Sequence, residues 1–154
     1  MRTFMLLAAV FLAGFTADAG NSDDPSAIRL GRTASGLMTV PVTIRNREFT
    51  FLLDTGSARS VLSRAAADEI RLSVAPGARM IGTTGTKDVG QAWVDELRVG
   101  GVTVEKHLLV VADLALLRRF DIKVDGLLGA DVLVRGQMRL DFKRGEFWLS
   151  RPGV

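Results

Sequence analysis

Two alternating runs of apolar residues, separated by a short polar break at Asn46-Arg47, constrain the fold of this chain more than any other feature. The apolar positions are Val40, Val42 and Ile44 in the first run and Phe49, Phe51 and Leu53 in the second. An apolar residue at every second position is typical of a β-strand that buries one face. The segment is therefore predicted to be a β-hairpin, and Asp54 comes directly after its second strand.

The rest of the chain repeats this pattern of strands and turns. Gly100-Gly101 and Lys143-Arg144-Gly145 each separate two alternating stretches, as hairpin turns do. Two short helices are expected, one over 64–70 with Ser63 as its N-cap and one over 130–134. Seven or more short strands with many turn signals predict an all-β domain that closes as a barrel.

Composition limits the chemistry that this chain can perform. Its 154 residues include no cysteine and one histidine, His107, which excludes disulfides, thiolate chemistry and zinc sites with several histidines. The 20 basic and 17 acidic residues are spread along the chain without the basic clusters that nucleic-acid binding requires. We expect no metal, no cofactor and no nucleic-acid partner. If the chain is an enzyme, carboxylates carry its proton chemistry.

The N-terminus has the three parts of a signal peptide. Arg2 supplies a positive charge, an uncharged apolar run follows over 4–15, and Ala17-Asp18-Ala19 places small residues at the cleavage positions. The apolar run is shorter than the ~20 residues of a membrane-spanning helix. Residues 1–19 are therefore predicted to be removed, which makes Gly20 the first residue of the mature protein.

Export sets the expected domain organisation. Residues 20–36 are polar and have no periodicity, which is typical of a linker or flexible arm, and the folded domain is expected over 37–151. The protein is expected to be secreted or periplasmic, without a membrane partner. In the alternative, an uncleaved N-terminal segment tethers an accessory domain to a membrane. N-terminal sequencing of the exported protein distinguishes the two.

The segment Asp54-Thr55-Gly56-Ser57, at the end of the predicted hairpin, is the first candidate for chemistry. Asp54 follows three apolar residues, which is an unusual place for a surface charge, and Gly56 permits a close approach of the backbone. Thr55 and Ser57 add hydroxyls that can hydrogen-bond to the carboxylate. Because the same residue types also build ordinary polar turns, the segment alone leaves both interpretations open.

Two later segments strengthen the functional interpretation. Residues 80–85 are typical of a strand that runs into a glycine-bounded hairpin tip, and Leu127-Leu128-Gly129 repeats the pattern of two leucines before a glycine turn. Taken in this order, the three segments resemble those of the retropepsin-like aspartic proteases, which include retroviral proteases and small bacterial relatives. The resemblance covers about residues 37–150.

The resemblance implies a role for each segment. Asp54 corresponds to the catalytic aspartate, and the loop that supports it corresponds to Thr55, Gly56 and Ser57. The flap that closes over a bound peptide corresponds to Ile81, Gly82, Thr83 and Thr84. The hydrophobic-hydrophobic-glycine motif beneath the catalytic loop corresponds to Leu127, Leu128 and Gly129. The implied fold is a closed acid-protease barrel with a hairpin flap.

An aspartic endopeptidase that cleaves peptides or proteins is the function implied by this resemblance. It needs two aspartates and a water molecule, without a metal or cofactor, and this chain has one Asp-Thr-Gly segment. The second carboxylate would therefore come from a second copy of the chain in a homodimer. Two carboxylates in contact share one proton, and the water between them attacks the peptide bond.

The chain departs from the retroviral pattern where those enzymes anchor their substrate. Retroviral enzymes have aspartates at the positions of Ala58 and Arg59 and an arginine at the position of Ala130. That arginine pairs with the first aspartate, so both charges are missing together and neither is left unpaired. Asp131 keeps the next position of the motif, and Arg59 is expected to favour acidic or polar substrate side chains. These departures motivate an alternative function, a catalytically weak or inactive module that binds peptides or dimerises.

Three further side chains are interpreted as structural. His107 stands between Lys106 and Leu108 in an alternating strand and is expected to be a surface or hydrogen-bonded histidine. Trp93 and Trp148 are expected in the core or on the face of the barrel rather than in a binding platform.

Overall fold

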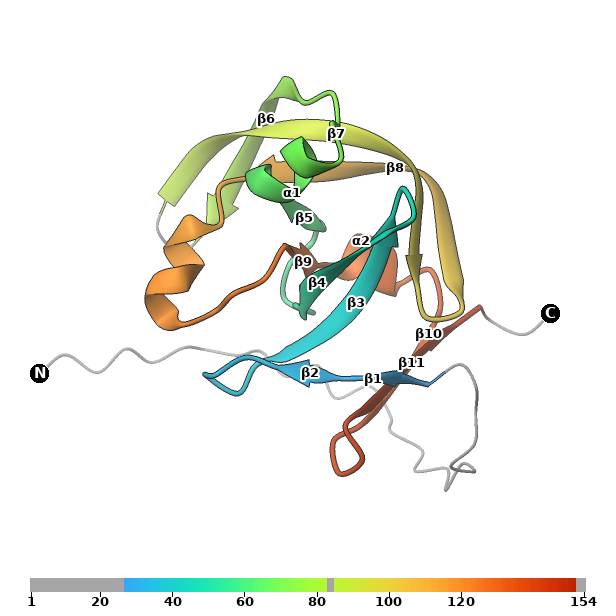
Figure 1. The fold of residues 1–154 in the computed structure, drawn as a ribbon. Coiled ribbons are helices and arrows are strands. Elements are labelled where there is room, and N and C mark those ends of the chain that lie inside the picture. The colour runs from blue at the N-terminus through green and yellow to red at the C-terminus, as the bar shows by residue number, and fades with distance from the viewer. Residues whose placement is uncertain (1–26, 83–84, 152–154) are drawn as a thin grey trace, which may run out of the picture.

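The computed structural model describes residues 27–82 and 85–151, and its strands form two sheets (Figure 1). The elements in chain order are β1 (Ile28–Arg29), β2 (Gly31–Arg32), β3 (Met38–Ile44), β4 (Arg47–Leu53), β5 (Val61–Ser63), α1 (Arg64–Glu69), β6 (Ala75–Gly82), β7 (Gly85–Val99), β8 (Val102–Ala112), the 3-10 helix η1 (Ala115–Phe120), β9 (Gly126–Leu128), α2 (Ala130–Leu133), β10 (Gln137–Asp141) and β11 (Glu146–Ser150). Within these ranges, no helix is both long and apolar enough to cross a bilayer. The segment predicted to be a signal peptide lies outside the described residues.

A closed barrel of six strands forms the body of the molecule. The larger sheet has the strand order β2-β3-β4-β9-β5-β8-β7-β6. A second pairing of β3, with β7 through Thr43↔Arg98 and Ile44↔Leu97, closes the ring. In Figure 1, the long strands β7 and β8 arch over the barrel, and β6 pairs with β7 to form the hairpin that contains predicted flap residues, here called the flap hairpin. The all-β barrel with short helices that the sequence predicts is confirmed.

Local sequence explains the turns and the first helix. Arg45 and Asn46 both have positive φ angles, 50° and 61°, so they form the two-residue turn that matches the twist of a hairpin. The turn therefore lies one residue earlier than the predicted break at Asn46-Arg47. The predicted cap of α1 is present, because Ser63 Oγ accepts a hydrogen bond of 3.1 Å from the N–H of Ala66.

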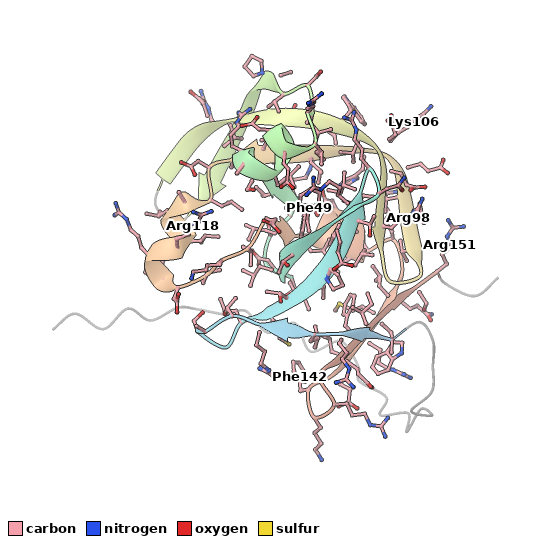
Figure 2. The ribbon with its side chains drawn as sticks, in the orientation of Figure 1. Phe49, Arg98, Lys106, Arg118, Phe142 and Arg151 are labelled. Atoms are coloured by element: carbon pink, nitrogen blue, oxygen red, sulfur yellow. The ribbon has the colours of Figure 1, made fainter. Side chains whose placement is uncertain are left out.

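The core lies inside the barrel and contains the apolar faces of the alternating strands. Its largest fully buried side chains are Phe51, Phe147, Ile44, Leu62, Leu97, Leu109, Leu128 and Leu149. In Figure 2, Phe49 points into this core, whereas Phe142 stands at the tip of the β10–β11 hairpin, away from the barrel. Removal of this apolar surface from water is the main favourable contribution to folding.

A three-stranded sheet with the order β1-β11-β10 brings the two ends of the domain together. The N–H of Leu30 donates to the carbonyl of Gly145 at 2.8 Å, so part of the segment predicted to be a linker is paired with the C-terminal hairpin. Two-residue strands are too short to show a period of two, which is why the sequence gives no sign of them. The Gly101 N–H donates to the Leu149 carbonyl at 2.8 Å and joins this sheet to the barrel.

Candidate active site

The candidate site is built where two parallel strands end side by side. β4 and β9 pair through Phe51↔Gly126, Leu52↔Leu127 and Leu53↔Leu128. Directly after this pairing, the N–H of Asp54 donates to the carbonyl of Leu128 at 3.0 Å. Two segments that are more than 70 residues apart in the sequence are therefore held together at Asp54.

The Asp54–Ser57 loop is a tight turn that leaves its carboxylate accessible. The N–H of Ser57 donates to the Asp54 carbonyl at 3.2 Å, and the N–H of Gly56 donates to Asp54 Oδ1 at 3.1 Å. Asp54 and Ser57 are partly buried, whereas Thr55 and Gly56 are exposed. In the described part of the chain, the Gly56 contact is the one hydrogen bond to this carboxylate. The loop can thus present Asp54 to a ligand.

Gly129 lies directly beneath the loop. A β-carbon at Gly129 would stand 2.6 Å from the carbonyl carbon of Arg59 and 2.9 Å from the carbonyl oxygen of Ser57, closer than real side chains approach backbone atoms. The next residue, Ala130, donates its N–H to the same Ser57 carbonyl at 2.8 Å. The structure therefore brings two of the predicted segments together, and only a glycine permits this approach.

Asp131, in the first turn of α2, is the most heavily contacted carboxylate near the loop. Its Oδ1 accepts hydrogen bonds from the N–H and the hydroxyl of Ser60 at 2.9 and 2.7 Å. Its Oδ2 lies 3.4 Å from Nε of Arg59 and 3.2 Å from Nε2 of His107. Burial raises the pKa of Asp131, but the contacts with His107 and Ser60 outweigh it and lower that pKa to about 2.

A cavity of about 1000 Å³ opens between α1, the base of the flap hairpin, the end of β8 and η1. Its lining includes the apolar side chains of Val74, Val89, Val111, Leu114, Leu117 and Leu127 and the charged side chains of Arg64, Asp68, Asp88 and Asp113. The cavity lies near the site, because Leu127 lines it and the carbonyl of the next residue, Leu128, accepts the hydrogen bond from Asp54. The Asp54–Ser57 loop is not part of the cavity wall.

The predicted flap residues fall at the end of β6. Ile81 pairs with Thr86, and Gly82 pairs with Gly85 at the beginning of β7. Thr83 and Thr84, the other two predicted flap residues, lie outside the described residues. The hairpin predicted for this segment is present up to Gly82, and its base lines the cavity.

Comparison with known protein families gives one match, to the family described as aspartyl protease, over residues 40–132. The match spans more than half of the chain and includes both the Asp54 loop and Gly129. This chain belongs to the aspartyl protease family. Its members are proteases, so the family supports a hydrolase of the protease type.

Solved structures show the same fold for this aspartyl protease family member. A retropepsin-like aspartic protease from Rickettsia conorii has 18% sequence identity and a TM-score of 0.61, over 81% of this chain and 90% of the other. The EIAV protease complexed with the inhibitor HBY-793 has 24% identity and a TM-score of 0.52, over 68% of this chain and 91% of that one. No curated protein sequence matches the chain.

This family member has an ion pair next to the two positions where its sequence departs from the retroviral pattern. The sequence indicates that both charges of the retroviral pair are lost, at Ala58 and Ala130. In the structure, the residues that follow these positions form an ion pair with the signs reversed: Arg59 on the loop side lies 3.4 Å from Asp131 on the helix side. Arg59 also donates to the carbonyl of Leu108 at 2.9 Å, so its guanidinium is already engaged by the protein.

Sequence reasoning missed the contribution of His107 to this cluster. The alternation that buries Val102 and Val104 would turn Lys106 inward and His107 outward. Lys106 instead has a positive φ of 47°, the alternation inverts there, and His107 is 7% exposed. The charge of Lys106 could have predicted this inversion, because an inward Lys106 would be a buried cation with no predicted partner. Of the tryptophans, Trp148 is buried as expected, whereas Trp93 on the barrel face is 65% exposed.

Proposed function

We propose that this protein is an aspartic endopeptidase that hydrolyses peptide bonds with two Asp54 residues, one from each subunit of a homodimer. The observation that carries the proposal is the Asp54 loop itself. Its backbone is fixed at Asp54 and at Ser57 by the segment around Gly129, while its carboxylate stays accessible. A fixed loop with an accessible acid is what general acid–base chemistry on a bound peptide requires.

The chemistry follows from two carboxylates in contact. Two neighbouring carboxylates cannot both ionise cheaply, so the pair holds one proton between them. The ionised Asp54 accepts a proton from water as the water oxygen bonds to the peptide carbonyl carbon, and the protonated Asp54 donates its proton to the carbonyl oxygen. The resulting tetrahedral diol then breaks its C–N bond as a proton passes to the leaving nitrogen. The protein forms no covalent bond with the substrate.

A second copy of the chain is needed because the sequence contains one Asp-Thr-Gly segment. The terminal sheet supports this part of the proposal. β10 is an edge strand of that sheet among the described residues, and edge strands readily pair with another chain. Met138 on β10 and Phe142 beside it are 40% and 57% exposed, which adds apolar surface for an interface.

The cavity supports a peptide as the substrate. Leu127 and the base of the flap hairpin both line it, and its wall combines apolar side chains with a few charged ones. Concave apolar sites with a few polar groups nearby are the usual places where ligands bind. We infer that side chains of the substrate enter this cavity while the scissile bond lies at Asp54.

Subunit mixing with the Asp54→Asn variant tests the chemistry and the shared site together. The variant alone is expected to lose about 10²–10⁴-fold or more of its peptide-cleaving activity, because the acid–base pair is gone. Added in excess to wild-type chain at a fixed concentration, it is expected to reduce the wild-type activity as mixed dimers form. Cleavage of a diverse peptide library over a pH series is the measurement, with Glu69→Gln as the added control chain.

The outcomes separate the alternatives. Wild-type cleavage by Asp54→Asn would refute the role of Asp54. An inactive variant that leaves the wild-type activity unchanged at any excess would refute the shared site. A wild-type chain that binds library peptides but cleaves none at any pH would favour the peptide-binding or dimerisation module instead.

A further inference from the structure

Asp131 joins three segments that are distant in the sequence. Arg59 and Ser60, which follow the Asp54–Ser57 loop, reach its carboxylate from one side, and His107 reaches it from β8. Asp131 itself lies on α2, and its side chain is 14% exposed. The Asp131 carboxylate therefore binds groups of the protein itself, and Asp131 is not among the residues that line the cavity.

The contacts of Asp131 continue to the candidate catalytic loop. The Ser60 hydroxyl donates to Asp131 and accepts a hydrogen bond of 3.0 Å from the N–H of Gly129. The residues on either side of Gly129 hold the loop: the Leu128 carbonyl accepts from the N–H of Asp54, and the Ala130 N–H donates to the carbonyl of Ser57. The loop and the Leu128–Asp131 segment are thus connected at both ends of the loop and again at Ser60. Asp131 supplies the charged connection among these.

We propose that Asp131 is a positioning residue for the proposed peptidase reaction: through Ser60 and Arg59 it fixes the Asp54–Ser57 loop, without touching the substrate. This inference rests on the proposed function. A loop at the end of two strands has few apolar contacts to hold it, so its geometry depends on hydrogen bonds and ion pairs. Misplacement of a catalytic group by about 1 Å can cost about 10²-fold in rate.

The charges around Asp131 suit this role in acid. Arg59 and His107 are the charged or titratable side chains that face its carboxylate, and Arg135 donates from Nε to its backbone carbonyl at 3.3 Å. The low pKa of Asp131 keeps it ionised at the acidic pH where an aspartate pair holds a single proton. The connection therefore persists where the proposed reaction runs.

The test compares three variants of the full chain. Asp131→Asn keeps the size of the side chain and removes its charge, and Arg59→Gln removes one partner at a half-exposed position where folding is at little risk. Glu69→Gln is the matched control, because it also removes a carboxylate that pairs with an arginine, Arg47, away from the loop. Each variant is measured for kcat and KM, and for hydrogen–deuterium exchange of the peptide covering residues 51–60.

A positioning role predicts a loss in kcat with little change in KM. We expect kcat to fall about 10- to 100-fold in Asp131→Asn and about 3- to 10-fold in Arg59→Gln, with KM within about threefold of wild type. The 51–60 peptide should exchange faster in both variants and unchanged in Glu69→Gln. If Asp131→Asn does not fold, the Arg59→Gln result decides.

Three results would overturn the inference: a folded variant with wild-type kcat, a loss confined to KM, or unchanged exchange in the 51–60 peptide. The exchange measurement needs no turnover, which separates this inference from the proposed function. An inactive wild-type chain whose loop exchanges faster in Asp131→Asn would refute the peptidase and leave the connection between Asp131 and the loop intact.

Discussion

Asp54 and Asp131 are two aspartates on adjoining segments, and their surroundings are opposite. Asp54 follows β4, is partly exposed, and accepts one hydrogen bond within the described residues, from Gly56. Asp131 lies in the first turn of α2 and is contacted by Ser60, Arg59 and His107. Its contacts with His107 and Ser60 hold its pKa well below the ordinary value. The carboxylate of Asp54 is therefore available to a ligand, whereas the carboxylate of Asp131, on the neighbouring segment, is occupied by contacts within the protein.

The Asp54–Ser57 loop can be held in place while the carboxylate of Asp54 stays accessible. A carboxylate that exchanges protons with water and substrate needs accessible oxygen atoms. The structure meets this need by holding the loop through backbone groups, at Asp54 N–H and at the Ser57 carbonyl, and through the side chain of Asp131. Asp54 therefore contributes its backbone to structure and leaves its side chain available for the proposed chemistry.

Replacement of Gly129, which lies between the Asp54 loop and Asp131, should have the largest effect on stability. In Gly129→Ala, the new methyl group would meet the Arg59 carbonyl at 2.6–2.7 Å, so the loop must move. We expect a loss of about 2–4 kcal/mol in the free energy of unfolding, measured by urea denaturation. Gly56→Ala is the control, because its β-carbon would meet only Asp54 Oδ1, at an ordinary 3.4 Å. Equal losses in both variants would contradict the close approach.

The second-largest effect is expected at Asp131, whose contribution to stability should decrease in acid. The folded protein lowers the pKa of Asp131 from 3.8 to about 2, so its ionised form stabilises the fold. This contribution, on the order of 2 kcal/mol, is present above about pH 4 and is lost as the pH falls through about 2. Urea unfolding of wild type and Asp131→Asn from pH 6 to pH 2 should show their difference shrinking. A difference that stays constant would mean that Asp131 is not stabilised as an anion.

The accessible aspartate should show the smallest effect on stability. Asp54→Asn keeps the backbone N–H that binds Leu128 and keeps an oxygen that can accept from Gly56. We expect the free energy of unfolding at pH 7 to change by less than about 0.5 kcal/mol, although cleavage is lost. A destabilisation as large as that of Asp131→Asn would remove the distinction between the two aspartates.

Local patterns in the sequence predicted the local parts of the fold. The alternation before Asp54, the glycine pair at residues 100–101 and the cap at Ser63 each act within a few residues, and each is present. The resemblance also selected segments that lie together, since Asp54 is held by Leu128. Periodicity describes one strand at a time, so it was silent on the placement of β9 between β4 and β5.

The Asp131 cluster was out of reach for the same reason. Arg59 and Asp131 are each ordinary surface residues by type, and their pairing depends on two segments that meet only in the fold. His107 joins them because Lys106 takes a positive φ, and its own position in the alternation predicts the opposite face. Long-range contacts of this kind leave no periodic trace in the sequence.

The length of β7 limits how this chain can vary in evolution. Its 15 residues run from the flap at Gly85 to the turn at Gly100, where Gly101 is hydrogen-bonded to the terminal sheet. Its C-terminal end is held there, so the insertion or deletion of one residue would turn the following side chains to the other face unless a bulge absorbs it. The connection over 113–124 belongs to no strand and can accommodate a change in length. Natural relatives are therefore expected to gain or lose residues around η1 while the number of residues from flap to terminal sheet stays constant.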